Sequence, residues 1–223
     1  TLALLITARA FDMLGRPRSD ILAVTMPCFG TTSRTKSNAQ VLAERIGADF
    51  RTVDIGEAVR VHFRDIGQSM DDLSVTFENG QARERTQVLM DLANQRGGLV
   101  IGTGDLSELA LGWATYNGDH MSMYGVNSSI PKTLVRHLVD YYADTCGDAA
   151  LAAILKDVLD TPVSPELLPP TDGVISQKTE DLVGPYRLHD FFLYYMLRWG
   201  YPPRKIYRVA CLAFDGIYEK ETI

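Results

Sequence analysis

Residues 99–108 read Leu99-Val100-Ile101-Gly102-Thr103-Gly104-Asp105-Leu106-Ser107-Glu108. The apolar start of this stretch predicts a strand, and its small residues predict a turn after it. A helix starting near Asp105 would then present free backbone N–H groups at the end of the strand. In open parallel sheets ligands collect beyond the carboxyl ends of the strands, so we expect chemistry in the loops after Met26, Ile55 and Ile101.

The segments before this stretch alternate between helix and strand patterns. An amphipathic helix is predicted over Gln81–Gln95, a second over Ser37–Ile46, and apolar strands over 20–26 and 49–55. We expect the strand over 20–26 to be fully buried. This order predicts right-handed parallel crossovers and therefore an α/β fold with a parallel sheet flanked by helices.

The remaining segments are predicted to be mainly helical. Helices are expected over 2–13, 131–142, 149–159, 188–199 and 203–214. The loop over 116–129 is long and rich in Gly, Asn, Ser and Met, which favours a binding loop or a contact surface. The proline-rich stretch over 161–176 has the composition of a mobile lid. We see no repeat or domain boundary, so residues 1–223 are predicted to form one domain.

The composition excludes several classes of protein. The chain has 46% hydrophobic and 22% charged residues and a net charge of −6, which is typical of a globular protein and disfavours nucleic-acid binding. No apolar run approaches the ~18–20 residues of a membrane-spanning helix. Cys28, Cys146 and Cys211 have no zinc-like spacing, so we expect free thiols and a cytoplasmic location.

The common catalytic motifs are missing from the sequence. There is no Walker phosphate loop, no serine-hydrolase elbow, no HExxH and no kinase catalytic loop. The four histidines lie far apart, so each is interpreted as structural or exposed. The chemistry must therefore be sought among other polar residues.

Two polar segments carry the candidate residues. Arg83 and Arg85 lie near a helix start, where cations are unfavourable, so they either face an anionic ligand or pair with nearby glutamates. Glu108 lies one turn into a helix and admits two interpretations. It could ligate Mg²⁺ beside nucleotide phosphates, or it could answer the helix dipole.

Four longer segments closely resemble the synthetase domain of NAD synthetase in its glutamine-dependent form. These are residues 31–39, 81–87, 102–120 (which includes Trp113-Ala114-Thr115-Tyr116-Asn117-Gly118-Asp119-His120) and 176–184. The resemblance extends from Thr1 to about Gly216. It implies a Rossmann-like parallel sheet of the adenine-nucleotide alpha-hydrolase type, that is, an ATP-pyrophosphatase fold.

The resemblance also implies the reaction. ATP adenylates the nicotinate carboxylate of deamido-NAD, and ammonia, drawn from a separate glutaminase domain, displaces AMP to give NAD. The family needs no covalent nucleophile, so no catalytic residue of that kind is expected. Mg²⁺ is the implied cofactor and ATP the co-substrate, and the family predicts a homo-oligomer, a dimer or larger.

Site residues follow from the resemblance position by position. The implied ATP-binding residues are Thr103, Lys132 and Thr161. The implied deamido-NAD-binding residues are Arg83, Glu108, Trp113, Ala114, Thr115 and Tyr116, and Glu108 is also the implied metal ligand. Pattern alone makes Trp113 and Tyr116 core aromatics, Thr161 a helix-ending hydroxyl and Lys178 an exposed charge of the lid.

The sequence also departs from the family pattern. The phosphate loop Ser-Gly-Gly-x-Asp-Ser is expected directly before Thr1, and a basic segment is expected after Ile223, so the domain is predicted to be partial at both ends. Cys28 and Gly80 stand where the family has Gly and Ser. Two alternatives stay open: a catalytically inert nucleotide-binding or assembly fragment, and another ATP-pyrophosphatase that amidates a different acid.

Overall fold

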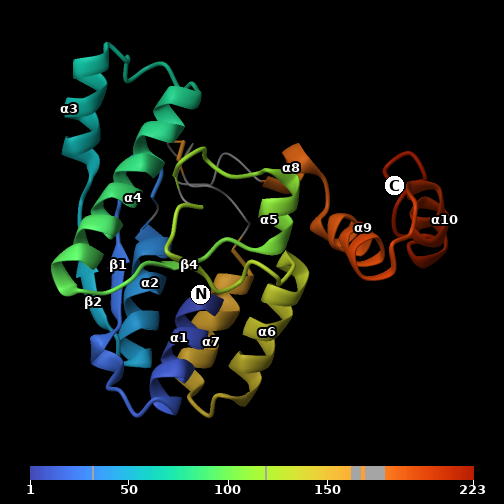
Figure 1. Cartoon of the computed structure of the whole chain (residues 1–223), viewed down its shortest axis with the longest axis horizontal. Helices are drawn as coiled ribbons and strands as arrows, with labels where there is room; N and C mark the ends of the chain where they lie inside the picture. Colours follow the sequence, from blue (N-terminus) through green and yellow to red (C-terminus); the bar gives the residue numbers. More distant parts are fainter. Residues whose placement is uncertain (32, 119, 162–166, 169–178) are drawn as a thin grey trace.

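The computed structural model describes residues 1–31, 33–118, 120–161, 167–168 and 179–223, without the side chains of residues 33–36 (Figure 1). Its strands are β1 (Leu22–Thr25), β2 (Asp49–Thr52), β3 (Ile101–Gly102) and β4 (Tyr124–Gly125). Its helices are α1 (Leu2–Met13), η1 (Arg18–Asp20), α2 (Ser33–Ile46), α3 (Gly56–Ile66), α4 (Val75–Arg96), α5 (Leu106–Leu111), α6 (Lys132–Thr145), α7 (Ala149–Leu159), α8 (Thr179–Val183), α9 (Tyr186–Trp199) and α10 (Pro203–Ala213).

Strands β1 and β2 form a parallel pair, with α2 as the connection between them. Leu22 lies opposite Asp49 and Thr25 opposite Thr52. The predicted parallel crossover is therefore confirmed. The prediction that the first strand is fully buried was wrong, because all four residues of β1 are half-buried. Within the described part of the chain β1 pairs with β2 alone, so its other edge has no neighbouring strand.

A second parallel pair joins β3 to β4. Ile101 lies opposite Tyr124 and Gly102 opposite Gly125. The loop expected over 116–129 therefore contains a short strand that its composition did not indicate. Gly102 allows this close approach, because a Cβ there would lie 2.3 Å from Ser122 Oγ. The pairing places the starts of α5 and α6 beyond the carboxyl ends of neighbouring strands.

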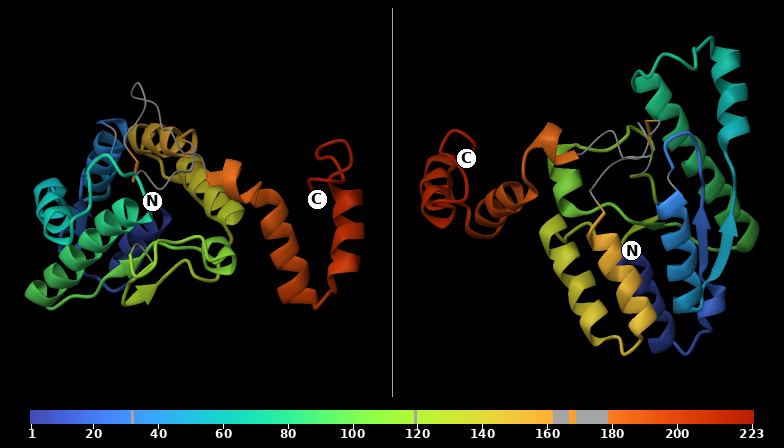
Figure 2. Two further views of the ribbon diagram at one scale, coloured as in Figure 1. Left: turned by 90° about the horizontal axis from the view of Figure 1, so that it is seen from above. Right: turned by 180° about the vertical axis from the view of Figure 1, so that it is seen from behind.

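The main core lies between the helices in the lower part of the body, where α1, α2, α6 and α7 run side by side (Figures 1 and 2). Its buried residues include Leu5, Leu42, Val139 and Leu155. The expected helix over 2–13 is confirmed, with Leu2, Ala3, Leu5 and Ala8 buried.

The hairpin of α3 and α4 has a separate core of Ile55, Val59, Phe63 and Phe77. Helix α3 was not predicted from the sequence. Its apolar residues Val59 and Phe63 are spaced four apart, but charged residues surround them. In the described part of the chain the helices are too short or too polar to cross a membrane.

Helices α9 and α10 form an arm that extends away from the body (Figures 1 and 2). Leu188, Ala210 and Phe214 are the buried residues that hold the two helices together. The base of α9 contacts α5 and α6, so the arm is attached close to the turn of residues 102–108. The predicted lid over 161–176 falls mostly outside the described residues.

Gly80 has a packing role inside α4. A Cβ at this position would lie 2.4 Å from Cε1 of Phe63, whose ring is 1% exposed. A serine, as the resembled family has here, would therefore collide with the hairpin core. Glycine in a helix interior costs about 1 kcal/mol relative to alanine, and the approach of Phe63 explains why it is present.

We predict that Gly80→Ala lowers the free energy of unfolding by roughly 1–2 kcal/mol, because overpacking of a filled core outweighs the gain in helix propensity. Urea denaturation followed by circular dichroism measures the change. Gly98→Ala is the matched control, since no atom lies within 4 Å of its added Cβ. A Gly80→Ala protein as stable as the control would show that Phe63 does not constrain this position.

Candidate functional site

The candidate site lies where β3 ends and α5 begins. Asp105 caps α5, because its Oδ1 accepts a hydrogen bond from the Glu108 N–H at 3.0 Å. Glu108 returns the interaction, since its Oε2 accepts from the Asp105 N–H at 3.2 Å. This reciprocal capping box fixes both carboxylates on the first turn of the helix.

Lys132 places its ammonium group between these two carboxylates. Its Nζ lies 2.8 Å from Asp105 Oδ2 and 2.5 Å from Glu108 Oε1. The side chains of Lys132 and Asp105 are 12% and 4% exposed, while that of Glu108 is 30% exposed. The site is therefore a half-open ion cluster whose more accessible member is Glu108.

The charges in the cluster stabilise the protonated lysine. Burial lowers the pKa of Lys132, but the carboxylates of Glu108 and Asp105 outweigh it and raise the pKa above its ordinary value of 10.5. Lys132 is consequently a cation throughout the physiological pH range. A compact ammonium held in this way suits the binding of phosphate oxygens.

Tyr186 of α9 forms one wall of the cluster. The Lys132 Nζ lies 5.3 Å from the centroid of its ring, within cation–π distance. Burial raises the pKa of Tyr186 to about 12, so the phenol stays protonated. Within the described part of the chain its buried hydroxyl has no hydrogen-bond partner.

A second group of predicted residues lies on α4 and the loop after α5. The Nε of Arg83 donates to the carbonyl oxygen of Tyr116 at 3.2 Å, and the hydroxyl of Thr86 donates to the carbonyl oxygen of Gly118 at 2.8 Å. Gly118 is buried against α4, because a Cβ there would lie 2.8 Å from the Cβ of Ala82. Helix α4 thus holds the 115–118 turn in place.

Most side chains of this second group reach solvent. Tyr116 is 70% exposed and Trp113 36% exposed, so the interpretation of these two as core aromatics was wrong. Arg83 and Ala114 are also exposed, and Thr115 is half-buried. This surface can meet a ligand without rearrangement of the core.

The structure brings some predicted residues together and leaves others apart. Glu108 and Lys132 are in direct contact, and the Trp113 N–H donates to the carbonyl oxygen of Glu108 at 3.1 Å. Thr103 is exposed, and its carbonyl oxygen accepts from Asn127 Nδ2 at 3.3 Å. Thr161 donates its hydroxyl to the Asp157 carbonyl oxygen at 2.9 Å, which is a helix-ending contact. Asp119 and Lys178 lie outside the described residues.

Four residues that build this site are not among those predicted from the sequence. Asp105 carries a readable signal, since an Asp three residues before a Glu is typical of a capping box. Ser107 donates its hydroxyl to Asp190 of α9 at 2.5 Å, and Tyr186 faces Lys132. These three residues carry no such signal, because their contacts join segments far apart in the chain.

The described part of the site does not have the donor set of a resident metal centre. Among the described residues no group of three or more His, Cys, Asp or Glu is placed to hold a metal ion. Asp105 and Glu108 are the two carboxylates of the site, and both pair with the ammonium group of Lys132.

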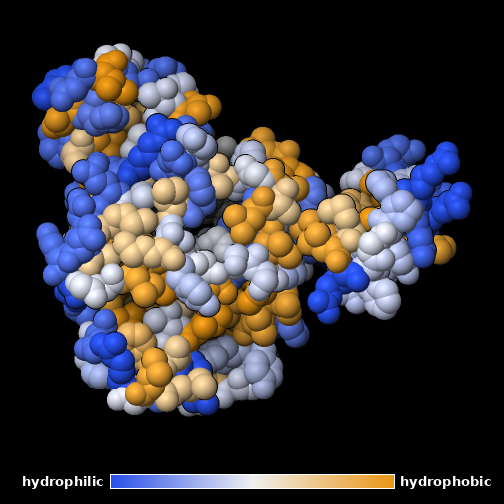
Figure 3. Space-filling view, viewed as in Figure 1, coloured by the Kyte–Doolittle hydropathy of each residue, from blue (hydrophilic) through white to orange (hydrophobic). Residues whose placement is uncertain are grey.

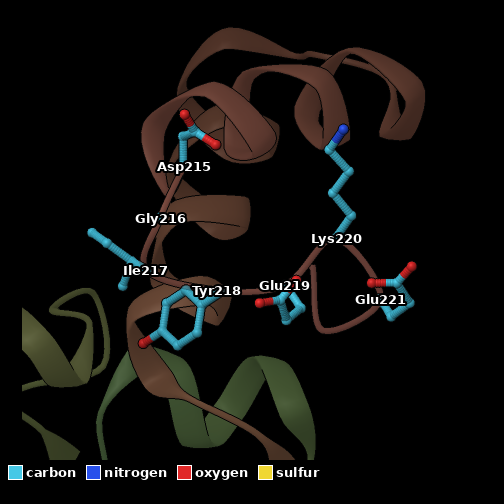
Figure 4. Close-up of a pocket in the computed structure, with 7 residues that line it drawn as sticks. All are labelled: Asp215, Gly216, Ile217, Tyr218, Glu219, Lys220 and Glu221. Carbon is cyan, nitrogen blue, oxygen red and sulfur yellow. The ribbon is translucent and has the colours of Figure 1, made fainter.

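Another pocket lies at the far end of the arm. Figure 4 shows that it is lined by Asp215, Gly216, Ile217, Tyr218, Glu219, Lys220 and Glu221, with the side chains of Asp215, Lys220 and Glu221 spread apart. All seven come from one continuous turn segment, and none is a predicted site residue. This pocket therefore does not compete with the cluster at α5 and α6 as a candidate.

Comparison with known sequences gives one family. The family model described as NAD synthase matches residues 2–208. The chain is 49% identical over 212 residues to a glutamine-dependent NAD(+) synthetase of Mycobacterium leprae, which covers 92% of this chain and 31% of that relative. The chain therefore spans about a third of the length of the curated relatives it matches.

Two solved structures share the fold. An NMN synthetase from Francisella tularensis gives a TM-score of 0.69 at 22% identity and covers 99% of this chain and 82% of that chain. A glutamine-dependent NAD+ synthetase from Acinetobacter baumannii, solved in complex with ADP, gives 0.58 at 26% identity and covers 99% of this chain and 36% of that chain. The predicted α/β fold of the ATP-pyrophosphatase type is confirmed.

We predict that Lys132→Met lowers the free energy of unfolding by about 2–3 kcal/mol, because it leaves the buried carboxylate of Asp105 without a counter-charge. The raised pKa of Lys132 means that its contribution is full below about pH 10.5 and is lost only as the pH rises through the folded-state pKa. Denaturant titrations at several pH values measure both effects.

The matched variant is Lys132→Met with Asp105→Asn. Asparagine still caps α5 but carries no charge, so the double variant should recover part of the lost stability. A double variant less stable than Lys132→Met would contradict the ion cluster as the source of the effect.

Proposed function

The chain belongs to the NAD synthase family, and we propose that it carries out the ATP-dependent amidation of deamido-NAD to NAD as the synthetase part of a glutamine-dependent enzyme. A nicotinate carboxylate oxygen attacks the α-phosphorus of ATP, and the bond to pyrophosphate breaks. The nitrogen of ammonia then attacks the activated carbonyl carbon, AMP leaves, and the nitrogen loses a proton. The observation that supports this most directly is the Lys132 ammonium held beyond the ends of β3 and β4.

The proposed ATP side comprises Lys132, Thr103 and Thr161. Lys132 would bind phosphate oxygens and stabilise the negative charge that develops as pyrophosphate leaves. Thr103 stands at the end of β3, on the exposed side of the same turn. Thr161 remains a proposal from the family resemblance, because its hydroxyl serves the end of α7 in this structure.

We propose that Mg²⁺ enters as the counter-ion of ATP and not as a resident metal. One or two carboxylates and the substrate phosphates suffice to hold Mg²⁺. Glu108 is the proposed protein ligand, since it is the more exposed carboxylate of the cluster. It becomes available when Lys132 exchanges this carboxylate for a phosphate.

The proposed deamido-NAD side comprises Arg83 and the residues from Trp113 to Tyr116, together with Glu108. The guanidinium of Arg83 carries fixed positive charge in an exposed position, which suits the pyrophosphate of a dinucleotide. Trp113 and Tyr116 offer exposed aromatic faces on which a ring can stack. Binding and orientation, and no covalent nucleophile of the protein, supply the catalysis in this scheme.

The ammonia of the second step is proposed to come from a separate glutaminase domain or partner. A reducing compartment such as the cytoplasm is the proposed location of the protein, because Cys28, Cys146 and Cys211 are free thiols. Residues 1–223 are proposed as one domain. The solved NMN synthetase has the same fold, so the fold alone does not choose between deamido-NAD and its mononucleotide counterpart.

We further propose that the protein assembles as a homo-oligomer, a dimer or larger, through the arm. Leu197 and Trp199 are each 59% exposed on α9, and Tyr194 is 51% exposed. Figure 3 shows apolar residues gathering also on the body beside the base of the arm. Exposed apolar side chains in this number are typical of an interaction surface.

We predict that Arg83→Ala, made in the full-length protein that contains this chain, raises the KM for deamido-NAD about tenfold, equivalent to ~1.4 kcal/mol of lost binding. The helix should stay folded, because Arg83 is exposed and its one described side-chain contact is the hydrogen bond to the Tyr116 carbonyl oxygen. Steady-state assays of NAD formation measure the change, with deamido-NAD and its mononucleotide counterpart as alternative substrates.

Arg96→Ala is the control, since Arg96 is an exposed arginine at the C-terminal end of α4 that pairs with Asp49, whereas Arg83 lies inside the helix. Equal KM values for both variants would refute the assignment of Arg83. A full-length protein that forms no NAD from deamido-NAD would support the alternative of a catalytically inert nucleotide-binding or assembly fragment. A preference for the mononucleotide would support the alternative of an ATP-pyrophosphatase that amidates a different acid.

We predict that Leu197→Glu converts the oligomer into a monomer, because it places a charge in the proposed contact. Light scattering after gel filtration measures the mass. Leu14→Glu, at a leucine that is 72% exposed on the body, should leave the mass unchanged. A wild-type monomer, or an unchanged mass in the Leu197→Glu protein, would rule out assembly through the arm.

A further inference from the structure

A buried carboxylate from the arm lies behind the ion cluster. Asp190 belongs to α9, is 7% exposed, and stands far along the chain from the two helices that it contacts. Its Oδ1 accepts from the Ser107 hydroxyl of α5 at 2.5 Å. Its Oδ2 accepts from the Thr133 N–H at 2.8 Å and from the Thr133 hydroxyl at 2.6 Å on α6.

These contacts replace a cap that α6 lacks. The residue before the helix is Pro131, whose side chain cannot accept a hydrogen bond. The first N–H groups of a helix need partners, and a negative charge there is favoured by the helix dipole. Asp190 serves the N–H of Thr133 directly. It serves that of Lys132 through Ser107, whose hydroxyl oxygen accepts from the Lys132 N–H at 2.9 Å.

The same network fixes the direction of the Lys132 side chain. Lys132 is the first residue of α6, so holding its own N–H and that of Thr133 sets where its Cβ points. In the sequence Ser107 lies between Asp105, the cap of α5, and Glu108. These two carboxylates form the ion pairs with the Lys132 ammonium. Asp190 therefore links the first turn of α6, which carries Lys132, to α5, at whose start the two carboxylate partners of Lys132 lie.

We propose that Asp190 is a positioning residue, which acts through Ser107 and Thr133 to hold Lys132 ready for the phosphates of ATP. This inference rests on the proposed function, because it needs Lys132 to bind ATP. A lysine held in advance loses less conformational freedom on binding than one that is free. Loss of Asp190 should therefore weaken ATP binding and leave deamido-NAD binding intact.

The test compares KM values in the full-length protein. Asp190→Asn should raise the KM for ATP about tenfold, because an amide nitrogen cannot accept from Thr133, and should change the KM for deamido-NAD less than twofold. Ser107→Ala removes the hydrogen bond to Asp190 and the one from the Lys132 N–H, and Thr133→Val removes the hydroxyl contact to Asp190. Each variant should raise the KM for ATP about threefold. They keep the test decisive if the Asp190→Asn protein does not fold.

Thr145→Val is the matched control for Thr133→Val. Thr145 is exposed at the other end of α6, where its hydroxyl donates to the Tyr141 carbonyl oxygen at 2.8 Å. This variant should have wild-type KM values for both substrates. An equal rise in both KM values in the Asp190→Asn protein would indicate a merely structural role and overturn the proposal.

Combination with Lys132→Met separates this inference from the proposed function. If Asp190 acts through Lys132, Asp190→Asn should raise the KM for ATP less than twofold further in the Lys132→Met background, whereas a full tenfold rise would overturn the proposal. If Lys132→Met raises the KM for ATP but Asp190→Asn, Ser107→Ala and Thr133→Val do not, the positioning role alone fails. If Lys132→Met leaves that KM unchanged, the proposed ATP role of Lys132 fails as well.

Discussion

The ammonium of Lys132, held between Asp105 and Glu108, is the interaction on which the candidate site depends. It joins the start of α6 to the start of α5 at the point where two parallel strands end. Burial of an isolated charge costs desolvation free energy, so the ammonium and the carboxylates of the cluster depend on one another. The fold meets this requirement by bringing residues 105, 108 and 132 together through the β3–β4 pairing.

The same arrangement explains how a structural cluster can also be a binding site. The carboxylates keep Lys132 charged, and the partial exposure of Glu108 leaves one side of the cluster open to a ligand. A phosphate group would offer the ammonium an equivalent negative partner. Binding then becomes an exchange of one anion for another, and the freed carboxylate is of the type that accompanies Mg²⁺ at nucleotide phosphates.

Local patterns predicted the parts of the fold that short segments determine. The strand, turn and helix of residues 99–108 follow from an apolar run and the small residues after it, and the parallel pairing of β1 with β2 follows from the helix between them. Helix α3 was missed because Val59 and Phe63 stand among charged residues. The need for glycine at position 80 depends on Phe63, which no neighbouring residue reveals.

The site was predictable only in part, for the same physical reason. Resemblance to NAD synthetases predicted roles for Glu108 and Lys132. It did not predict their direct contact, because it assigns a role to each position separately. Asp190 and Tyr186 reach the cluster from the arm, and nothing in the helical pattern of residues 186–199 distinguishes them from packing residues. Contacts between distant segments are a property of the folded chain.

The central claim is that Lys132 exchanges its carboxylate partners for the phosphates of ATP. A crystal structure of the full-length protein with a non-hydrolysable ATP analogue and deamido-NAD tests it most directly. We expect Nζ of Lys132 to lie within hydrogen-bond distance of a phosphate oxygen and to have left Glu108. An ammonium still paired with both carboxylates, with the triphosphate bound elsewhere, would contradict it.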